Sequence, residues 1–163
     1  MKYTTSIEID VPREKVVQLL ADPAHLPKWL RGLVVHEPVD GAHGELGTTS
    51  RVVFQFGKQR MEATETITRR EPADLHAIPG SVVVHYDREI AGNGLWQAQR
   101  DRILEAGPGA TLWESDNEFR FDGFLMRMVA RVMPRSFRKQ SRQVMEDFKA
   151  FAEKGTDVRD ATN

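Results

Sequence analysis

Glu65 is the residue whose position most suggests chemistry. In an extended strand, alternation places its carboxylate on the same face as Met61 and Ile67. A buried carboxylate must find a partner or take up a proton, because burial penalises the charged form. It would then anchor a ligand hydroxyl or carbonyl, or act as a general acid or base. Two other interpretations stay open: an ion pair with an internal arginine such as Arg100 or Arg102, or a bulge that turns Glu65 outward.

Ser115 and Asn117 are weaker polar candidates on the last predicted strand. They share one face with Trp113 and Phe119, so their side chains are expected to form hydrogen bonds among aromatic residues. His85 alternates outward from its strand neighbours, which makes it a poor candidate for a catalytic base.

Several familiar motifs are missing. The five histidines show no metal-ligand spacing on a helix and no HExxH pattern, and the chain has no cysteine. The glycines of segment 92–94 lack the lysine and the strand–helix context of a phosphate-binding loop, and no serine lies in a GxSxG elbow. We therefore expect no metal and no other cofactor.

The composition indicates one ordinary globular domain. The chain has 163 residues, 29% charged and 40% apolar, with a formal net charge of −1. This length can bury a sizeable core, and the charge gives no global attraction to nucleic acid. No apolar stretch resembles a signal peptide or a membrane span, so the expected location is cytoplasmic.

The hydrophobic period changes along the chain in an informative order. Alternation over 2–10 predicts a strand, Val16, Val17 and Leu20 share one face of a short helix, and Trp29 belongs to a second helical turn. Further strands are predicted at 33–39, 47–56, 59–70, 82–89, 95–105 and 110–121, and a closing helix from near 123 to about 154. Segment 73–81 is either an interrupted edge strand or a loop. We expect one domain over 1–155 and a disordered tail over 156–163.

Pro134 interrupts the closing helix. Proline inside a helix removes a hydrogen bond and clashes with the preceding turn, so a kink or break is expected there. The first half of the helix would then be able to move as a flap over a cavity mouth.

The order strand, two short helices, six strands and long helix resembles the SRPBCC superfamily, which includes START lipid-transfer domains, birch-pollen allergen proteins and polyketide cyclases. The resemblance covers about residues 1–155 and is closest to small bacterial members. It rests on segments 9–16, 28–29, 65–68, 117–123, 133–134 and 147–155. It implies an α+β helix-grip fold, in which a curved antiparallel sheet of about seven strands wraps around the C-terminal helix. It also implies a pocket between sheet and helix for lipids, polyketides or other apolar molecules, but no catalytic motif carries over.

Side chains on the inward faces of these elements would line such a pocket. Mobile methionines and rigid aromatic rings suit an apolar ligand, although the same side chains are equally suited to fill a core. The predicted lining consists of Trp29, Phe54, Phe56, Met61, Glu65, Tyr86, Trp96, Trp113, Ser115, Asn117, Phe119, Met128, Val132, Met133 and Phe137.

The closing helix also carries a row of basic residues at helical spacing. They are Arg127, Arg131, Arg135, Arg138 and Arg142. They would contact an anionic membrane surface or an acidic protein, or they form a solvated face that pairs with acids at the sheet edge.

The sequence thus predicts a carrier or sensor of a small hydrophobic ligand, oriented by Glu65 and Asn117. One alternative is a cyclase- or aromatase-like enzyme that uses the same pocket, with Glu65 moving protons. Another is a protein-interaction module that resembles the chaperone-ATPase activators and uses the basic helix.

Overall fold

The structure is a computed structural model that describes residues 1–160. Its strands are β1 (Lys2–Ile9), β2 (Leu33–Asp40), β3 (Thr49–Phe56), β4 (Gln59–Glu71), β5 (Val84–Gly92), β6 (Leu95–Gly107) and β7 (Ala110–Phe121). Its helices are α1 (Arg13–Ala21), the 3-10 turn η1 (Pro23–His25), α2 (Leu26–Trp29), α3 (Phe124–Val132) and α4 (Pro134–Lys154).

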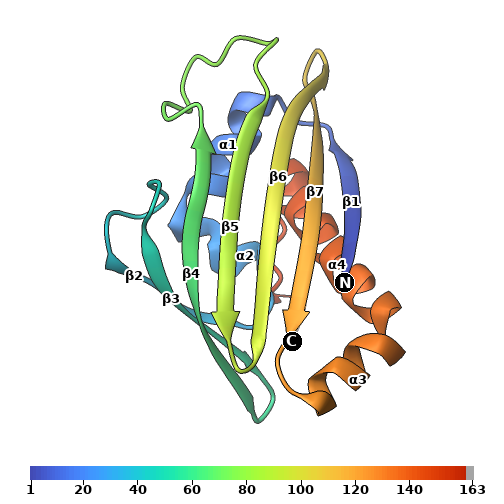
Figure 1. Ribbon diagram of the computed structural model, residues 1–163. Helices are drawn as coiled ribbons and strands as arrows, with labels where there is room; N and C mark the ends of the chain where they lie inside the picture. Colours follow the sequence, from blue (N-terminus) through green and yellow to red (C-terminus); the bar gives the residue numbers. More distant parts are fainter. Residues whose placement is uncertain (161–163) are drawn as a thin grey trace.

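The seven strands form one antiparallel sheet in the order β1-β7-β6-β5-β4-β3-β2. The sheet is curved, and α1, α2 and α4 lie on its concave side (Figure 1). This is the helix-grip fold that the sequence predicts. Among the described residues, no helix has the length and apolar content needed to span a bilayer.

Strand register defines which side chains face the helices. Trp113 on β7 lies opposite Ile103 on β6, which lies opposite Val84 on β5, and all three are buried. Because side chains alternate along a strand, every second residue from these positions faces the concave side. The same face includes Ser115, Asp101, Tyr86 and Arg88, whereas the intervening residues point outward.

The interior contains two apolar clusters. The larger one lies under α1, α2 and α4, where Trp29 and Trp113 each meet Phe148 edge-on at 5.1 and 5.5 Å between ring centroids. All three rings are fully buried. The smaller cluster joins Tyr3, Phe119 and Phe121 to partly buried side chains of α3 and α4, among them Phe137.

Two connecting regions bear on the sequence predictions. The closing helix is broken at Met133, which has a non-helical backbone, and Pro134 occupies the first turn of α4, as the sequence predicts. Segment 73–81 forms bends and a turn, not a strand, and Leu75 within it is buried.

The predicted disordered tail needs correction over 156–160. Val158 is buried, and its N–H donates to the carbonyl of Lys28 in α2. This part of the chain is held because an apolar side chain and a backbone donor both find partners. Residues 161–163 lie outside the described residues.

Candidate functional site

Three charged side chains meet on the concave face of the sheet. Glu65 on β4, Arg88 on β5 and Asp101 on β6 are 8%, 12% and 3% exposed. One guanidinium nitrogen of Arg88 lies 3.8 Å from Glu65 Oε2, and another lies 3.8 Å from Asp101 Oδ2. We call these residues the Arg88 cluster. It brings two carboxyl groups and one cation together inside the fold.

The guanidinium of Arg88 is incompletely satisfied. Both carboxylate contacts are longer than a hydrogen bond, for which about 2.7–3.2 Å is usual. Its buried Nε–H has no acceptor, and no hydrogen bond from Arg88 to another described residue is found. Leaving buried donors unpaired is costly, and guanidinium N–H groups match oxygen anions and carbonyls well. The geometry therefore suits an oxygen atom supplied by a ligand.

Glu65 is tied to two stacked histidines. His36 Nε2 lies 3.0 Å from Glu65 Oε1, and His36 Nδ1 lies 2.9 Å from Nε2 of His43. Burial acts to raise the pKa of Glu65, but the His36 hydrogen bond and the Arg88 charge outweigh it and hold this pKa below its usual value. Burial lowers the pKa of His43. The two ring nitrogens of His36 thus join Glu65 and His43 in a continuous hydrogen-bonded chain.

The carboxyl group of Asp101, on the other side of Arg88, has a different environment. Burial raises the pKa of Asp101 above its usual value, and the charge of Arg88 offsets this only in part. The side-chain amide of Gln99 lies 3.2 Å from both Asp101 carboxylate oxygens. Burial also raises the pKa of Tyr86, which stays a neutral phenol beside Arg88. Arg88 thus lies between one carboxyl group whose pKa is lowered and one whose pKa is raised.

The polar candidates of β7 extend this arrangement across the sheet. Ser115 lies opposite Asp101 and Asn117 opposite Gln99 in the β6–β7 register, and both are buried. The Asn117 amide is 3.3 Å from the Ser115 carbonyl. A polar belt therefore runs over the concave face from His36 to Asn117.

The aromatic candidates divide between the two ends of the concave face. Trp29 and Trp113 are sealed in the larger cluster against Phe148. Phe119 and Phe137 pack in the smaller cluster, with ring centroids 5.3 Å apart. Phe54 is partly buried, whereas Phe56 and Met61 are 44% and 45% exposed near the tip of the β3–β4 hairpin. The apolar surface that remains accessible therefore lies at the tip of this hairpin, beyond Phe54, which itself packs against the larger cluster.

The structure corrects the placement of Trp96. Trp96 lies opposite Arg120, an outward residue of β7, so its ring is on the convex face. There it stacks under the Arg120 guanidinium at 4.4 Å, and its Nε1 lies 3.4 Å from Glu89. Trp96 points outward because side chains alternate along β6 and its neighbours Leu95 and Gln97 point inward.

The candidates on α3 and at its C-terminal end are exposed to solvent. Met128, Val132 and Met133 are exposed, because the helix turns Met126 and Ala130 toward the smaller cluster. Their predicted contact with a ligand stays a prediction.

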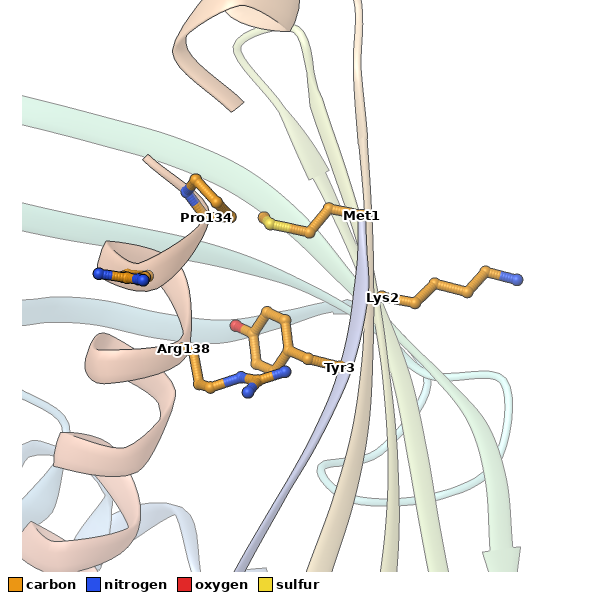
Figure 2. Close-up of a pocket in the computed structure, with 6 residues that line it drawn as sticks. Met1, Lys2, Tyr3, Pro134 and Arg138 are labelled. Carbon is orange, nitrogen blue, oxygen red and sulfur yellow. The ribbon is translucent and has the colours of Figure 1, made fainter. Parts of the chain in front are cut away.

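Two hollows border β1. One of about 240 Å³ lies at the α3–α4 break, where Met1 and Tyr3 point from β1 toward the helix and Lys2 points to the other side of β1 (Figure 2). The other, about 610 Å³, is a groove between β1 and α4 that includes Ile7, Leu112 and Arg142. The predicted cavity between the sheet and the closing helix stays a prediction.

Four polar members of the site were not recognised in the sequence: His36, His43, Arg88 and Asp101. Alternation was sufficient to find two of them, because Arg88 shares its phase with Tyr86 and Asp101 shares its phase with Ile103. The predicted partners of Glu65 were Arg100 and Arg102, but these lie outside, near Glu118 and Asp116. The phase of His36 was hidden by an irregularity in the β2–β3 register between Leu33 and Val35.

Comparisons with known proteins agree with this architecture. The family model described as polyketide cyclase / dehydrase and lipid transport matches residues 1–153. No curated protein sequence matches the chain. Similar solved structures include the protein TTHA0849 from Thermus thermophilus, with TM-score 0.71 and 13% identity over 93% of this chain and 97% of that one.

Two enzymes share the fold at similar distance. The Zhui aromatase/cyclase from a Streptomyces species has TM-score 0.66 and 12% identity over 97% of this chain and 99% of that one. Norcoclaurine synthase from Thalictrum flavum, solved with dopamine and hydroxybenzaldehyde, has TM-score 0.65 and 14% identity over 92% of this chain and 84% of that one. The family match over nearly the whole length shows that the chain belongs to the polyketide cyclase / dehydrase and lipid transport family of the SRPBCC superfamily.

Proposed function

We propose that this protein binds a small, largely apolar molecule on the concave face of its sheet and holds an oxygen group of that molecule at Arg88. The observation that carries the proposal is the buried guanidinium without a hydrogen-bond acceptor, 3.8 Å from both Glu65 and Asp101. A ligand carboxylate, enolate or carbonyl would satisfy its N–H groups. The apolar body of the ligand would extend toward Phe54, Met61 and Phe119.

The charges beside Arg88 set the preferred ligand group. Ionised Glu65 partly neutralises Arg88, whereas burial raises the pKa of Asp101 and so disfavours its charged form. An anionic oxygen would therefore add to a site that still has positive character. A neutral molecule of the same shape would gain only the apolar contacts.

Two fluorescent probes of matched shape test this preference. 1-Anilinonaphthalene-8-sulfonate carries an anionic group, and N-phenyl-1-naphthylamine has the same rings without it. We expect the folded protein to bind the sulfonate more tightly, and Arg88→Gln to lose roughly tenfold of this affinity, the value of about one charged hydrogen bond. Its affinity for the neutral amine should stay within about twofold.

Arg100→Gln is the matched control, because it removes the same charge from the convex face of the neighbouring strand. It should leave both affinities unchanged. Glu65→Gln should strengthen sulfonate binding, since it removes the anion beside Arg88. Equal binding of both probes by the unmodified protein, or equal effects of Arg88→Gln and Arg100→Gln, would contradict the proposal.

An enzymatic role is the second candidate, and the His43–His36–Glu65 chain favours it. The Glu65 carboxylate, hydrogen-bonded to His36, would accept a C–H proton beside a carbonyl bound at Arg88 and return it, and its lowered pKa keeps it ionised but makes it a weak base. Propiophenone, whose α-hydrogens exchange slowly, provides the test by NMR in deuterated water. Exchange accelerated by the protein and lost in Glu65→Gln supports catalysis. The same exchange rate in both proteins would contradict catalysis and support binding as the only role.

A further inference from the structure

Helix α3 presents its apolar side to solvent. Phe124, Leu125 and Val132 are 79%, 75% and 76% exposed, and Met128 and Val129 are also open. In Figure 1, α3 projects beyond the end of β7. A surface helix normally turns its apolar stripe toward the core, so this helix lacks a partner on most of its apolar side.

Around the axis of α3, exposed apolar, inward-facing and basic residues occupy three separate sectors. At 100° per residue, the five exposed apolar residues occupy an arc of roughly 140°, and Met126 and Ala130 face the smaller cluster from outside that arc. Arg127 and Arg131 flank the apolar arc on its other side. An apolar arc bordered by arginines is the pattern of helices that lie in a membrane interface.

The charge of this region is of one sign. Residues 123–145 contain no Asp or Glu, and their basic residues are Arg127, Arg131, Arg135, Arg138, Lys139 and Arg142. Within the described part of the chain, only Arg142 among these pairs with a carboxylate, that of Glu146. The alternative in which acids at the sheet edge pair with the other members of the row is therefore not realised.

The break between the helices adds a recess to the cationic side. Arg135 and Arg138 line the hollow of about 240 Å³ beside Pro134. Figure 2 shows the Arg138 guanidinium beside the Tyr3 ring, and its central carbon lies 5.5 Å from the ring centroid. The recess offers room for an anionic group next to the apolar arc.

We propose that α3 and the first turns of α4 dock on an anionic lipid bilayer, with the apolar arc of α3 in the interface and the arginines among lipid phosphates. A second copy of the chain is a poorer occupant, since a symmetric contact would bring like charges together. Closure of α3 over the concave face is also a poorer fit, because it would leave the arginine row without anions. The bilayer satisfies both the apolar and the charged surface.

Vesicle sedimentation tests the proposal. The unmodified protein should bind vesicles of phosphatidylcholine with about one-third phosphatidylglycerol at low salt, and bind pure phosphatidylcholine vesicles far more weakly. Each basic residue near an anionic surface strengthens binding roughly fivefold, so Arg131→Gln with Arg135→Gln should weaken binding about twentyfold. Leu125→Gln with Val132→Gln should weaken it comparably, and these exposed positions leave the core intact.

Two control pairs lie elsewhere on the surface. Lys58→Gln with Arg60→Gln removes two exposed charges from the β3–β4 hairpin, and Val39→Gln with Leu46→Gln removes two exposed apolar side chains. Both should bind vesicles like the unmodified protein. No vesicle binding at low salt, equal binding to both lipid compositions, or concentration-dependent dimers abolished by Leu125→Gln with Val132→Gln would each overturn the proposal.

Discussion

Arg88 and Glu65 form a buried pair in which each residue offsets the charge of the other. Removing one partner leaves an uncompensated charge, and this generally costs about 3 kcal/mol or more. We predict that Arg88→Met lowers the free energy of unfolding by about this amount. Adding Glu65→Gln should restore part of the loss, because the remaining carboxylate is then neutralised. Urea unfolding of both single variants and the double variant measures this coupling.

Simple additivity would contradict the prediction. If the double variant loses the sum of the single losses within about 0.5 kcal/mol, the two side chains do not interact. The 3.8 Å separation makes the pair looser than a direct hydrogen bond, so the coupling also measures how strongly the two charges stabilise each other at this distance.

The pKa of His43 gives a prediction for pH. Burial lowers this pKa below 6.5, so the folded protein takes up the proton less readily than the unfolded chain. The free energy of unfolding is therefore unaffected by this group above pH 6.5. It decreases as the pH falls from there toward the lowered pKa, because the unfolded chain then takes up more protons at this position. We expect His43→Gln, which keeps a donor for His36, to lose less stability between about pH 7 and pH 5. Parallel stability curves for the two proteins over this range would refute the assignment.

How well single residues could be placed from the sequence depended on whether the alternation of each strand identifies its inner face. Glu65, Ser115 and Asn117 were placed on the inner face because apolar neighbours marked that face clearly. The prediction for Trp96 is wrong, because its aromatic ring suggests a pocket lining whereas the alternation of β6 turns it outward. His36 and His43 were inaccessible to sequence reasoning, because one follows a register shift and the other lies in a loop that only the tertiary fold brings to Glu65.

At the scale of elements, the close approach of β5 to β4 depends on Gly92. A Cβ atom at this position would lie 2.5 Å from the Glu62 carbonyl oxygen and 2.9 Å from the Ala63 Cα, and backbone atoms cannot easily yield. We predict that Gly92→Ala destabilises the protein by about 2 kcal/mol or more, as overpacking does. Thermal and urea unfolding provide the measurement.

Gly155 is the matched comparison, because it has a different reason to be glycine. It ends α4 with φ near +69°, and a Cβ there would meet no atom within 4 Å. Gly155→Ala should therefore cost only the backbone strain, about 1 kcal/mol. If Gly155→Ala costs more than Gly92→Ala, the close approach of β4 and β5 is not the limiting contact.

The elements themselves were largely predictable. Alternation identified all seven strands, and Pro134 indicated the break in the closing helix, because both signals are local. The solvent-facing orientation of α3 was not predictable. Its apolar arc was wide enough to suggest a cavity lining, and only the packing of Met126 and Ala130 decides which side is inward.

At the scale of the molecule, stability and binding are predicted to reside at opposite ends of the concave face. Phe148 is fully buried between Trp29 and Trp113, whereas Phe137 is partly buried at the end near α3. Phe148→Ala should cost about 3–5 kcal/mol of unfolding free energy but change the affinity for the neutral naphthylamine little. Phe137→Ala should cost less stability and weaken that affinity more. The same ratio of effects in both variants would show that the two ends are not separate.

The most direct measurement of the central claim is the NMR resonance of the Arg88 Nε–H group during addition of the sulfonate probe, assigned by its loss in Arg88→Gln. This N–H has no acceptor among the described residues. We predict that the resonance moves downfield and exchanges with water more slowly as the sulfonate binds, and that the neutral amine leaves it unchanged. An Arg88 resonance that stays fixed while the Arg138 resonance moves would place the ligand at the α3–α4 break and contradict the account.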